Sequence, residues 1–241
     1  MPRFFVNKED INGDSAVVRG ADAVHIGRSL RMRLGDELTV CCEGKDYTCR
    51  LDSVSDEQCG LTVLSVSEGS GEPSVRVTLY QAVPKSDKLE LIVQKAVELG
   101  ASEIVPVLTS RCVSRPDEKS YRKKRERLNK IALEAAKQCG RSIVPTVGDI
   151  ISAEECAKRL GEHELGLICY EKGGAPLSET VGRECRDIGI FIGSEGGFDE
   201  AEVDKCRAEG AKVIGMGPRI MRCETAPLAA IAVVMSLTGN I

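Results

Sequence analysis

The stretch Ile192-Gly193-Ser194-Glu195-Gly196-Gly197-Phe198 closes a short apolar run with a glycine turn. A second stretch repeats this arrangement further along the chain: Gly215-Met216-Gly217-Pro218-Arg219-Ile220-Met221-Arg222-Cys223-Glu224-Thr225-Ala226. Each turn leads toward a helix-like segment. Because glycine lets backbone N–H and C=O groups approach a ligand closely, two such turns predict a pocket built from main-chain loops.

Outward from these turns, residues 74–241 alternate between short apolar strands and amphipathic helices. The pattern predicts strands at 75–80, 104–108, 165–169, 188–192 and 212–214, and helices at 88–99, 121–139, 200–209 and 225–237. This alternation indicates an α/β fold with a mostly parallel sheet. Ligands of such sheets bind beyond the carboxyl ends of the strands, and both glycine turns fall at that kind of position.

The N-terminal part has a different pattern. Alternating runs at 37–41 and 61–66, separated by turn signals, predict short strands and a small β-barrel. The polar, glycine-bearing segment 68–73 is typical of a linker. We therefore predict two domains, a β-barrel over residues 1–70 and an α/β domain over residues 71–241.

Composition narrows the classes of function. The chain has 42% hydrophobic and 29% charged residues, as soluble globular proteins do, and its 3% aromatic content supplies little base stacking. Eleven cysteines occur without a Cys-x-x-Cys pair and with only two histidines, so we expect no metal site. The absence of a signal-like or membrane-spanning stretch, together with an odd cysteine count, predicts a cytoplasmic protein that does not bind membranes.

Two enzyme classes are disfavoured because key residues are missing. Gly215-x-Gly217-x-x-Ile220 lacks the third glycine of the dinucleotide fingerprint. Ser194 lies in a strand-to-helix turn, but a nucleophile elbow requires glycine where Ile192 stands. The elbow's histidine also follows its serine, whereas both histidines precede Ser194.

Basic residues are concentrated between Arg111 and Arg141. This segment holds eleven basic and four acidic residues, a local net charge of +7 in a chain of net charge −4. A charge run is often only a solvated helix face, but a concentrated excess of one sign favours contacts with nucleic-acid phosphates. A smaller cluster, residues 25–33, is either a second RNA contact or the rim of a strand with exposed arginines.

Two charged residues stand inside the glycine turns. We expect Glu195 to lie where its turn opens a helix, because a helix N-terminus favours negative charge. It then either caps that helix or binds a ligand. Arg222 and Glu224 precede the last helix, where they either pair with each other or face the ligand.

Several of these segments together resemble one family. They are Pro2-Arg3-Phe4-Phe5, the 25–31 stretch, Pro84-Lys85-Ser86-Asp87-Lys88, Gln94-Lys95-Ala96-Val97-Glu98-Leu99-Gly100, residues 134–141 and both glycine turns. The chain closely resembles the RsmE family, the bacterial 16S rRNA uridine-N3 methyltransferases of the SPOUT superfamily. Ser194 departs from the family, which often has proline there, and so do Met221 and Cys223.

The resemblance implies a PUA-like β-barrel followed by a SPOUT methyltransferase domain with a deep C-terminal trefoil knot. It implies a homodimer that binds S-adenosyl-L-methionine in the knot and releases S-adenosyl-L-homocysteine. The implied substrate is one uridine of 16S rRNA, presented by the assembled small ribosomal subunit. No metal is implied.

The resemblance also assigns residues. Our catalytic hypothesis is separate from the resemblance: Arg222 places a cation in the pocket loop, with no histidine at hand, and would stabilise the uracil anion, and Glu195 is the second candidate, as an acidic helper. The cofactor-binding candidates are Tyr170, Glu171, Gly193, Ser194, Glu195, Gly196, Gly197, Met216, Gly217, Ile220, Met221, Thr225 and Ala226. The RNA-binding candidates are Arg3, His25, Arg28, Arg31, Lys85, Lys88, Arg111 and Arg141.

Two alternatives stay open. A non-catalytic RNA-binding or ribosome-assembly protein would account for the basic segment, although it would have no need of a main-chain cofactor pocket. A SPOUT enzyme acting on tRNA would have the same cofactor loops and a different RNA-binding surface.

Overall fold

The computed structural model of the protein describes all residues 1–241 and divides into two compact units. The first comprises residues 1–72 and 136–144, and the second comprises residues 73–135 and 145–241. The first unit therefore includes the last turn of a helix that begins in the second. Each unit has its own sheet and core.

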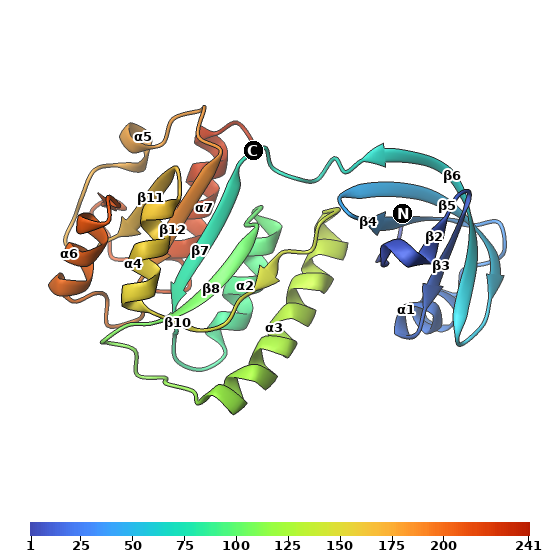
Figure 1. The fold of residues 1–241 in the computed structure, drawn as a ribbon, viewed down its shortest axis with the longest axis horizontal. Helices are drawn as coiled ribbons and strands as arrows, with labels where there is room; N and C mark the ends of the chain where they lie inside the picture. Colours follow the sequence, from blue (N-terminus) through green and yellow to red (C-terminus); the bar gives the residue numbers. More distant parts are fainter. The chain divides into compact units, whose positions relative to one another are not determined.

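The first unit is built on a curled six-stranded sheet (Figure 1). In spatial order its strands are β1 (Arg3–Phe5), β4 (Glu37–Cys42), β5 (Lys45–Val54), β6 (Gln58–Glu68), β3 (Ser15–Arg19) and β2 (Ile11–Asn12). All neighbours are antiparallel except β1 and β4. Phe4, Val18, Ile26, Leu38 and Leu51 are among the residues that fill its core.

The cluster at residues 25–33 is not the rim of a strand. It begins in a π-helical turn (His25–Ser29) that continues α1 (Ala21–Val24). Ile26 points into the core, while His25 and Arg28 are exposed. The strand expectation is wrong because isolated apolar residues among polar ones, such as Ile26, Leu30 and Met32, occur in a short helical turn as well as in a strand.

The second unit contains a seven-stranded sheet in which every pairing is parallel. The path runs β10 (Ile151–Ser152), β8 (Glu103–Leu108), β7 (Arg76–Ala82), β12 (Asp187–Ile192), β11 (Leu165–Cys169) and β13 (Lys212–Ile214), with β9 (Thr146–Val147) also beside β8. The predicted parallel α/β sheet is confirmed.

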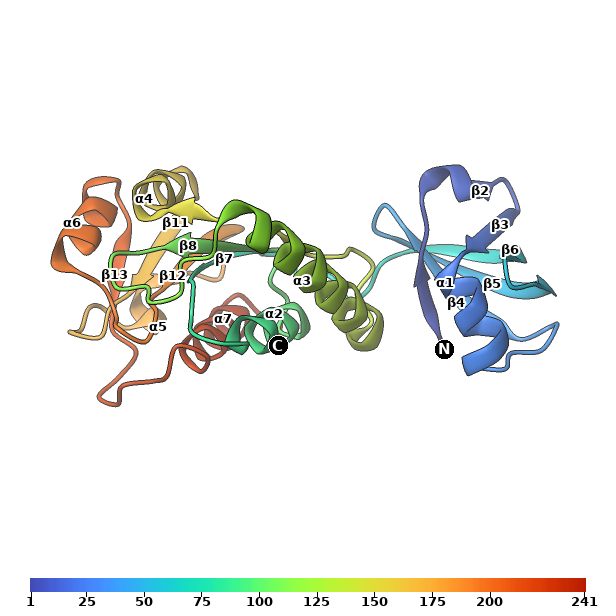
Figure 2. The same ribbon diagram turned by 90° about the horizontal axis from the view of Figure 1, so that it is seen from below.

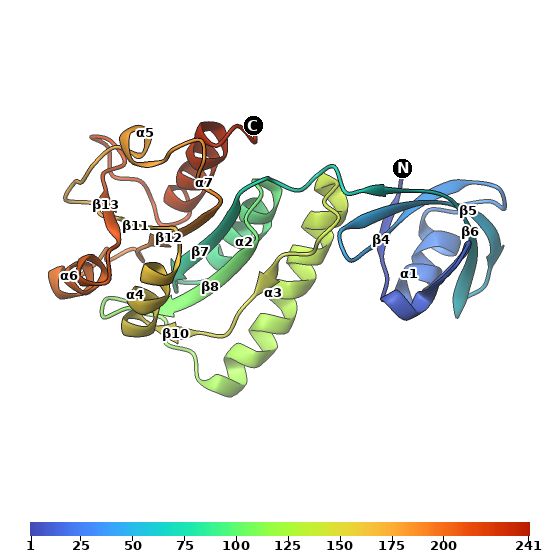
Figure 3. The same cartoon turned by 45° about the horizontal axis from the view of Figure 1, so that its top comes forward.

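Helices cover both faces of this sheet. Figure 2 shows α4 (Ala153–Glu162) and α6 (Glu200–Ala208) on one face, and α2 (Lys88–Glu98) and α7 (Ala226–Leu237) on the other. The short α5 (Leu177–Thr180) packs against α7. The longest helix, α3 (Glu118–Cys139), is clearest in Figure 3. The spacing of Leu89, Ile92, Val93 and Ala96 gives α2 its buried face, as the sequence predicts.

All eleven cysteines are free thiols, and nine of them are buried. No three His, Cys, Asp or Glu side chains are grouped so that they could hold a metal ion. No helix has both the length and the apolar character that crossing a membrane requires.

The strand order brings three loops together. In the sheet register, Cys169 at the end of β11 is paired with Ile192 at the end of β12 and with Ile214 at the end of β13. The segments that follow these strands therefore leave the same edge of the sheet side by side. Two of them are the glycine turns, and the third begins at Tyr170.

Candidate active site

The three loops enclose a cavity of about 690 Å³. Its walls come from Cys169–Gly173, Ile192–Phe198 and Gly215–Cys223, with Lys88 and Ala226 completing the lining. A volume of this size suits a ligand of several hundred daltons. The cavity lies beyond the carboxyl ends of parallel strands, where such folds bind their ligands.

The first glycine turn is tightly fixed. The N–H of Gly197 donates to the carbonyl of Ser194 at 3.0 Å, and Gly197 has a φ of 67°, which favours glycine. Phe198 is fully buried against Phe191, with ring centroids 4.7 Å apart. A β-carbon on Gly193 would lie only 3.2 Å from the Phe198 ring. The main chain of this turn therefore has little freedom to move.

Two polar side chains support the same turn from outside the cavity. Arg111 donates from Nη1 to the carbonyl of Gly196 at 2.9 Å and from Nε to Asp199 Oδ1 at 2.8 Å. Gln81 is fully buried at the end of β7, and its Nε2 donates to the carbonyl of Gly193 at 3.3 Å. The sequence analysis missed Gln81, although a lone amide within the run Leu79–Val83 is an available signal.

A lysine joins the two glycine loops. Lys88 Nζ, on the first residue of α2, lies 3.1 Å from Glu195 Oε1 and 3.0 Å from Glu224 Oε2. Cys223 Sγ lies 3.7 Å from the same ammonium group. The backbone N–H of Lys85 also donates to both Glu195 oxygens, at 3.2 and 3.4 Å. One cation thus connects the first turn, the second loop and the start of α2.

These contacts set the charge states at the cavity mouth. The hydrogen bond from Lys88 lowers the pKa of Glu224. Burial raises the pKa of Glu195, but hydrogen bonds from backbone N–H groups and from Lys88 outweigh it, so the net shift is downward. The hydrogen bonds that Lys88 donates to the Glu224 and Glu195 carboxylates raise its pKa. Burial raises the pKa of Cys223 to about 12. The mouth at neutral pH therefore holds two carboxylates, one ammonium and a neutral thiol.

Glu195 does not lie at a helix N-terminus, so that expectation is wrong. Helix α6 begins at Glu200, and Asp199 caps it in a capping box with Glu202. Asp199 and Glu202 occupy the favourable position that the sequence analysis gave to Glu195, because the turn runs longer than its glycines suggest. Glu195 is instead free to bind Lys88.

The second loop is much less packed. Gly217 has a φ of 88°, and a β-carbon placed there would meet no atom within 4 Å. Ile220 is 87% exposed, and the Arg222 side chain is 83% exposed with its Nη1 4.0 Å from Glu224 Oε1. The Arg222 carbonyl accepts the N–H groups of Thr225 and Ala226 at 2.8 and 2.9 Å, which starts α7. The loop is therefore anchored at its ends and open at its tip.

The third loop supplies a tyrosine and a carboxylate. Tyr170 is 7% exposed, and its buried hydroxyl has no hydrogen-bond partner in the protein. Such a group usually has a partner, but this hydroxyl is closed off from solvent, so it does not face the cavity. The Glu171 carboxylate stands against Gly197, where a β-carbon would displace it. The cavity volume and the main-chain turns fit a polar ligand.

The structure brings together almost all the residues that the sequence assigned to the cofactor. Every cofactor candidate lines the cavity except Thr225, which is the exposed N-cap of α7. The catalytic candidates Arg222 and Glu195 also line it. Lys88, an RNA candidate, lies in the wall as well. Lys172, Arg219 and Cys223 are lining residues that the sequence analysis did not select.

The RNA-binding candidates do not form one group. Lys85 and Arg111 lie next to the first turn, as described above. In the first unit, Arg28 pairs with Asp56, His25 meets the Phe4 ring edge-on, and Arg31 is exposed.

Two RNA candidates are engaged inside the first unit. Arg141 is 3% exposed and its Nη2 lies 2.7 Å from Glu72 Oε2. Arg3 lies 2.6 Å from Asp46 and also bonds Ser142. Because their guanidinium groups hold this unit together, we leave Arg3 and Arg141 out of the RNA-contacting set.

Comparison with known proteins defines the class. Residues 71–235 match the family model of the RNA methyltransferase domain. The chain is 35% identical over 246 residues to the ribosomal RNA small subunit methyltransferase E of Bacillus subtilis (strain 168), with 97% of this chain and 96% of that protein covered. Its identity to the Mesomycoplasma hyopneumoniae (strain 232) protein of the same name is 30%, covering 95% and 96%. The chain therefore belongs to the ribosomal RNA small subunit methyltransferase E family.

A solved structure agrees over the whole length. The crystal structure of a ribosomal RNA small subunit methyltransferase E from Neisseria gonorrhoeae, bound to S-adenosyl methionine, is 29% identical in sequence and matches this fold with a TM-score of 0.85. The match covers 98% of each chain. The resemblance drawn from the sequence motifs is confirmed.

Proposed function

We propose that this protein transfers a methyl group from S-adenosyl-L-methionine to N3 of one uridine in 16S rRNA of the small ribosomal subunit. The observation that carries the proposal is the cavity where β11, β12 and β13 end, because two of its three walls are main-chain glycine turns. The family match and the S-adenosyl methionine bound by the Neisseria gonorrhoeae structure support it. S-adenosyl-L-homocysteine would be the second product.

Backbone groups and side chains of the cavity would have different roles in binding the cofactor. Backbone groups of Gly193, Gly196, Gly197, Met216 and Gly217 would hold the cofactor, whose sulfonium supplies an electrophilic methyl group. The side chains of Tyr170, Glu171, Ser194, Ile220, Met221 and Ala226 would form the surrounding wall, with Thr225 fixing the start of α7 behind it. The tight packing of the first turn would orient the donor before the substrate arrives, which lowers the entropic cost of reaction.

Arg222 is our catalytic candidate. Methylation at N3 requires the uracil ring to lose its N3 proton, so negative charge develops on the base. The Arg222 guanidinium is exposed at the cavity mouth and has only a 4.0 Å contact with Glu224, so it is available to face that charge. Glu195, held ionised by Lys88 and the Lys85 N–H, would position this mouth and is not suited to donate a proton.

Membership of the family also supports a proposal for the domain folds and the oligomeric state. The C-terminal part would form a trefoil knot, the first unit would be a PUA-like barrel, and the protein would act as a cytoplasmic homodimer. Helix α7 is apolar all round, yet Val233 on it is 40% exposed and Leu91 on the adjacent α2 is 45% exposed. Such a helix is normally covered, and a second copy of the chain would cover it.

The proposed substrate is the assembled small subunit, contacted by both units. In the first unit His25, Arg28 and Arg31 would contribute, and in the second Lys85, Lys88 and Arg111. Arg28 would have to exchange Asp56 for a phosphate, and Arg111 would have to exchange Asp199. Lys88 would act mainly by holding the cavity mouth.

Nucleoside mass spectrometry of 16S rRNA tests the proposal. A strain that lacks the gene should lose N3-methyluridine from 16S rRNA, and the wild-type gene should restore it. Restoration by an Arg222→Gln gene would contradict the role of Arg222. Unchanged 16S rRNA together with a methyl group lost from tRNA would support a tRNA enzyme. No change in any RNA, with no binding of S-adenosyl-L-methionine in calorimetry, would support a non-catalytic RNA-binding protein.

A further inference from the structure

The basic segment 111–141 separates in the structure into two groups of side chains. Some of its cations have partners within the chain: Arg111 with Asp199, Arg125 with Asp149, Arg127 with Glu90, Lys137 with Asp22 and Arg141 with Glu72. Arg115 donates to the carbonyls of Thr109 and Ser110, and Lys124 to that of Ser86. Most of the positive charges in this segment are therefore engaged in contacts within the protein.

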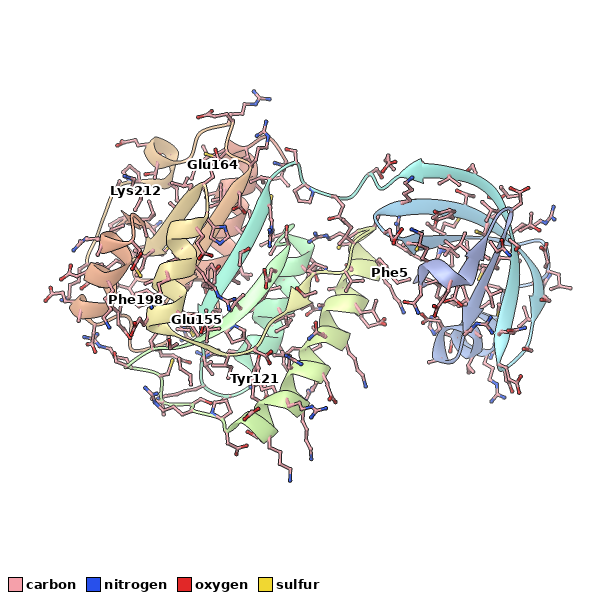
Figure 4. All side chains as sticks on the ribbon, in the orientation of Figure 1. Phe5, Tyr121, Glu155, Glu164, Phe198 and Lys212 are labelled. Atoms are coloured by element: carbon pink, nitrogen blue, oxygen red, sulfur yellow. The ribbon has the colours of Figure 1, made fainter.

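Four cations on α3 remain without a protein partner. They are Lys119, Arg122, Lys123 and Lys130, and all four are exposed. We call them the α3 cationic face. The opposite side of the helix packs inward through Tyr121, Leu128 and Ala132, and the Tyr121 hydroxyl donates to the Gly148 carbonyl at 2.7 Å. Figure 4 labels Tyr121 and shows long side chains with nitrogen ends projecting from α3.

Helix periodicity places these cations together. Lys119, Lys123 and Lys130 follow one another at spacings of four and seven residues, which puts them on one side of a helix. Glu118, Glu126 and Glu134 lie near them and are also exposed, so four cations face three carboxylates and the face keeps a small excess of positive charge. Bringing unpaired like charges together costs free energy unless an anion neutralises them.

Other residues of α3 connect the helix to the turn beside the candidate active site. Lys124 Nζ reaches the carbonyl of Ser86 at 3.5 Å, and Arg127 reaches Glu90 on α2 at 2.8 Å. Ser86 belongs to the turn in which the Lys85 N–H holds Glu195. The helix is therefore fixed against the same turn that borders the cavity mouth, and Lys85 in this turn is an exposed cation.

We infer that the α3 cationic face is a docking surface for the phosphate backbone of the substrate RNA. This inference rests on the proposed function, and it adds a surface that leads phosphates toward the cavity. Four exposed lysine and arginine side chains on a fixed helix suit phosphate oxygens and read no base edges. The surface would strengthen binding and position the RNA without selecting the uridine.

The test compares two double variants that remove the same charge. Lys123→Gln/Lys130→Gln alters the α3 cationic face, and Lys205→Gln/Lys212→Gln removes two exposed cations from α6 and β13 (Lys212 is labelled in Figure 4). Glutamine keeps helix propensity close to that of lysine, and equal melting temperatures would verify that both variants fold. Affinity is measured over a series of KCl concentrations, with unmodified small subunits and with a naked 16S rRNA transcript as probes.

Affinity falls as salt rises, and in the α3 variant the slope of log affinity against log salt concentration should be shallower by about 2. The matched control should keep the slope of the wild-type protein. In methyl-transfer assays the α3 variant should show a raised KM with kcat and S-adenosyl-L-methionine affinity unchanged. Equal slopes in all three proteins would overturn the inference. A loss seen with subunits and absent with the naked transcript would also overturn it, because the partner would then be a ribosomal protein.

The same experiment separates this inference from the proposed function. If the wild-type protein methylates the subunits but the α3 variant binds them normally, only the docking surface is wrong. If the wild-type protein transfers no methyl group to 16S rRNA, the proposed function fails. In that case the slopes with the naked transcript still decide whether the α3 cationic face binds RNA.

Discussion

Gly193–Phe198 and Gly215–Cys223 face the same cavity, but their surroundings differ. The first turn is held by Gln81 and Arg111 from behind and by the buried Phe198 ring from within. The second has an exposed tip, with a glycine at positive φ where a β-carbon would meet no atom within 4 Å, and an isoleucine that is 87% exposed. Segments with few buried contacts open at lower free energy than well-packed ones.

This difference in packing indicates that the two loops have different functions. The packed turn would give the cofactor a preformed main-chain surface, while the open loop would close over it and present Arg222 to the base. Lys88 is the connection between them, because its ammonium contacts a carboxylate from each loop. The predictions below test this division, beginning with the largest expected effect.

Arg222 tests whether the open loop carries chemistry. We expect Arg222→Gln to lower kcat by about 100-fold, the usual cost of removing a group that stabilises transition-state charge. Because the side chain is 83% exposed and makes one long contact, cofactor affinity and melting temperature should stay near wild type. An Arg222→Lys or Arg222→Gln protein that methylates at the normal rate would rule out this role.

Lys88 tests the connection between the loops. Lys88→Met leaves Glu195 and Glu224 without their shared cation, so we expect affinity for S-adenosyl-L-methionine to fall at least about tenfold in calorimetry. Lys88→Arg keeps the charge and should recover part of the loss. The matched control is Lys95→Met on the same helix, since Lys95 pairs only with Glu98. Equal effects of Lys88→Met and Lys95→Met would contradict the special position of Lys88.

The two positive-φ glycines compare the loops directly. Alanine at such a φ costs about 1 kcal/mol, and at Gly197 it must also displace the Glu171 carboxylate. We expect Gly197→Ala to weaken cofactor binding by about tenfold and Gly217→Ala by only a few fold, measured by calorimetry. A larger effect at Gly217 than at Gly197 would reverse the assignment of packed and open loops.

The smallest expected effect is on the pH dependence of stability. Because the pKa values of Glu195 and Glu224 are lowered in the folded protein, their ionised forms stabilise it above the ordinary Glu pKa of about 4.3. This contribution is lost as the pH falls through the lowered values. The difference in melting temperature between wild type and Lys88→Met should therefore be largest near neutral pH and shrink on acidification below about pH 5. A difference that stays constant with pH would show that Lys88 acts without these carboxylates.

Local patterns in the sequence were sufficient to predict much of this molecule. Apolar periodicity placed five of the seven strands of the parallel sheet and helices α2, α6 and α7, while β9, β10 and α4 were missed. The glycine turns gave most of the cavity lining. Contacts between distant residues were beyond such reasoning. The order β12, β11, β13 that joins the loops is set by packing, and so is the approach of Lys88 to Glu195 and Glu224.

The charge composition likewise could not show which charged residues pair with each other in the fold. The sequence shows an excess of cations at 111–141, but only the fold reveals that Arg141 binds Glu72 while Lys123 has no partner. Glu195 was misplaced at a helix end because glycines mark a turn without fixing its length. Asp199, further along, supplies the cap.

Hydrogen–deuterium exchange with and without S-adenosyl-L-methionine tests the two-loop pocket most directly. Without cofactor, amides at 193–198 should exchange slowly and those at 215–222 quickly. With saturating cofactor, the 215–222 segment should become strongly protected, while 193–198 changes little and a remote segment such as α4 does not change. Saturable binding that leaves exchange at 215–222 unaltered would contradict the cofactor site proposed here.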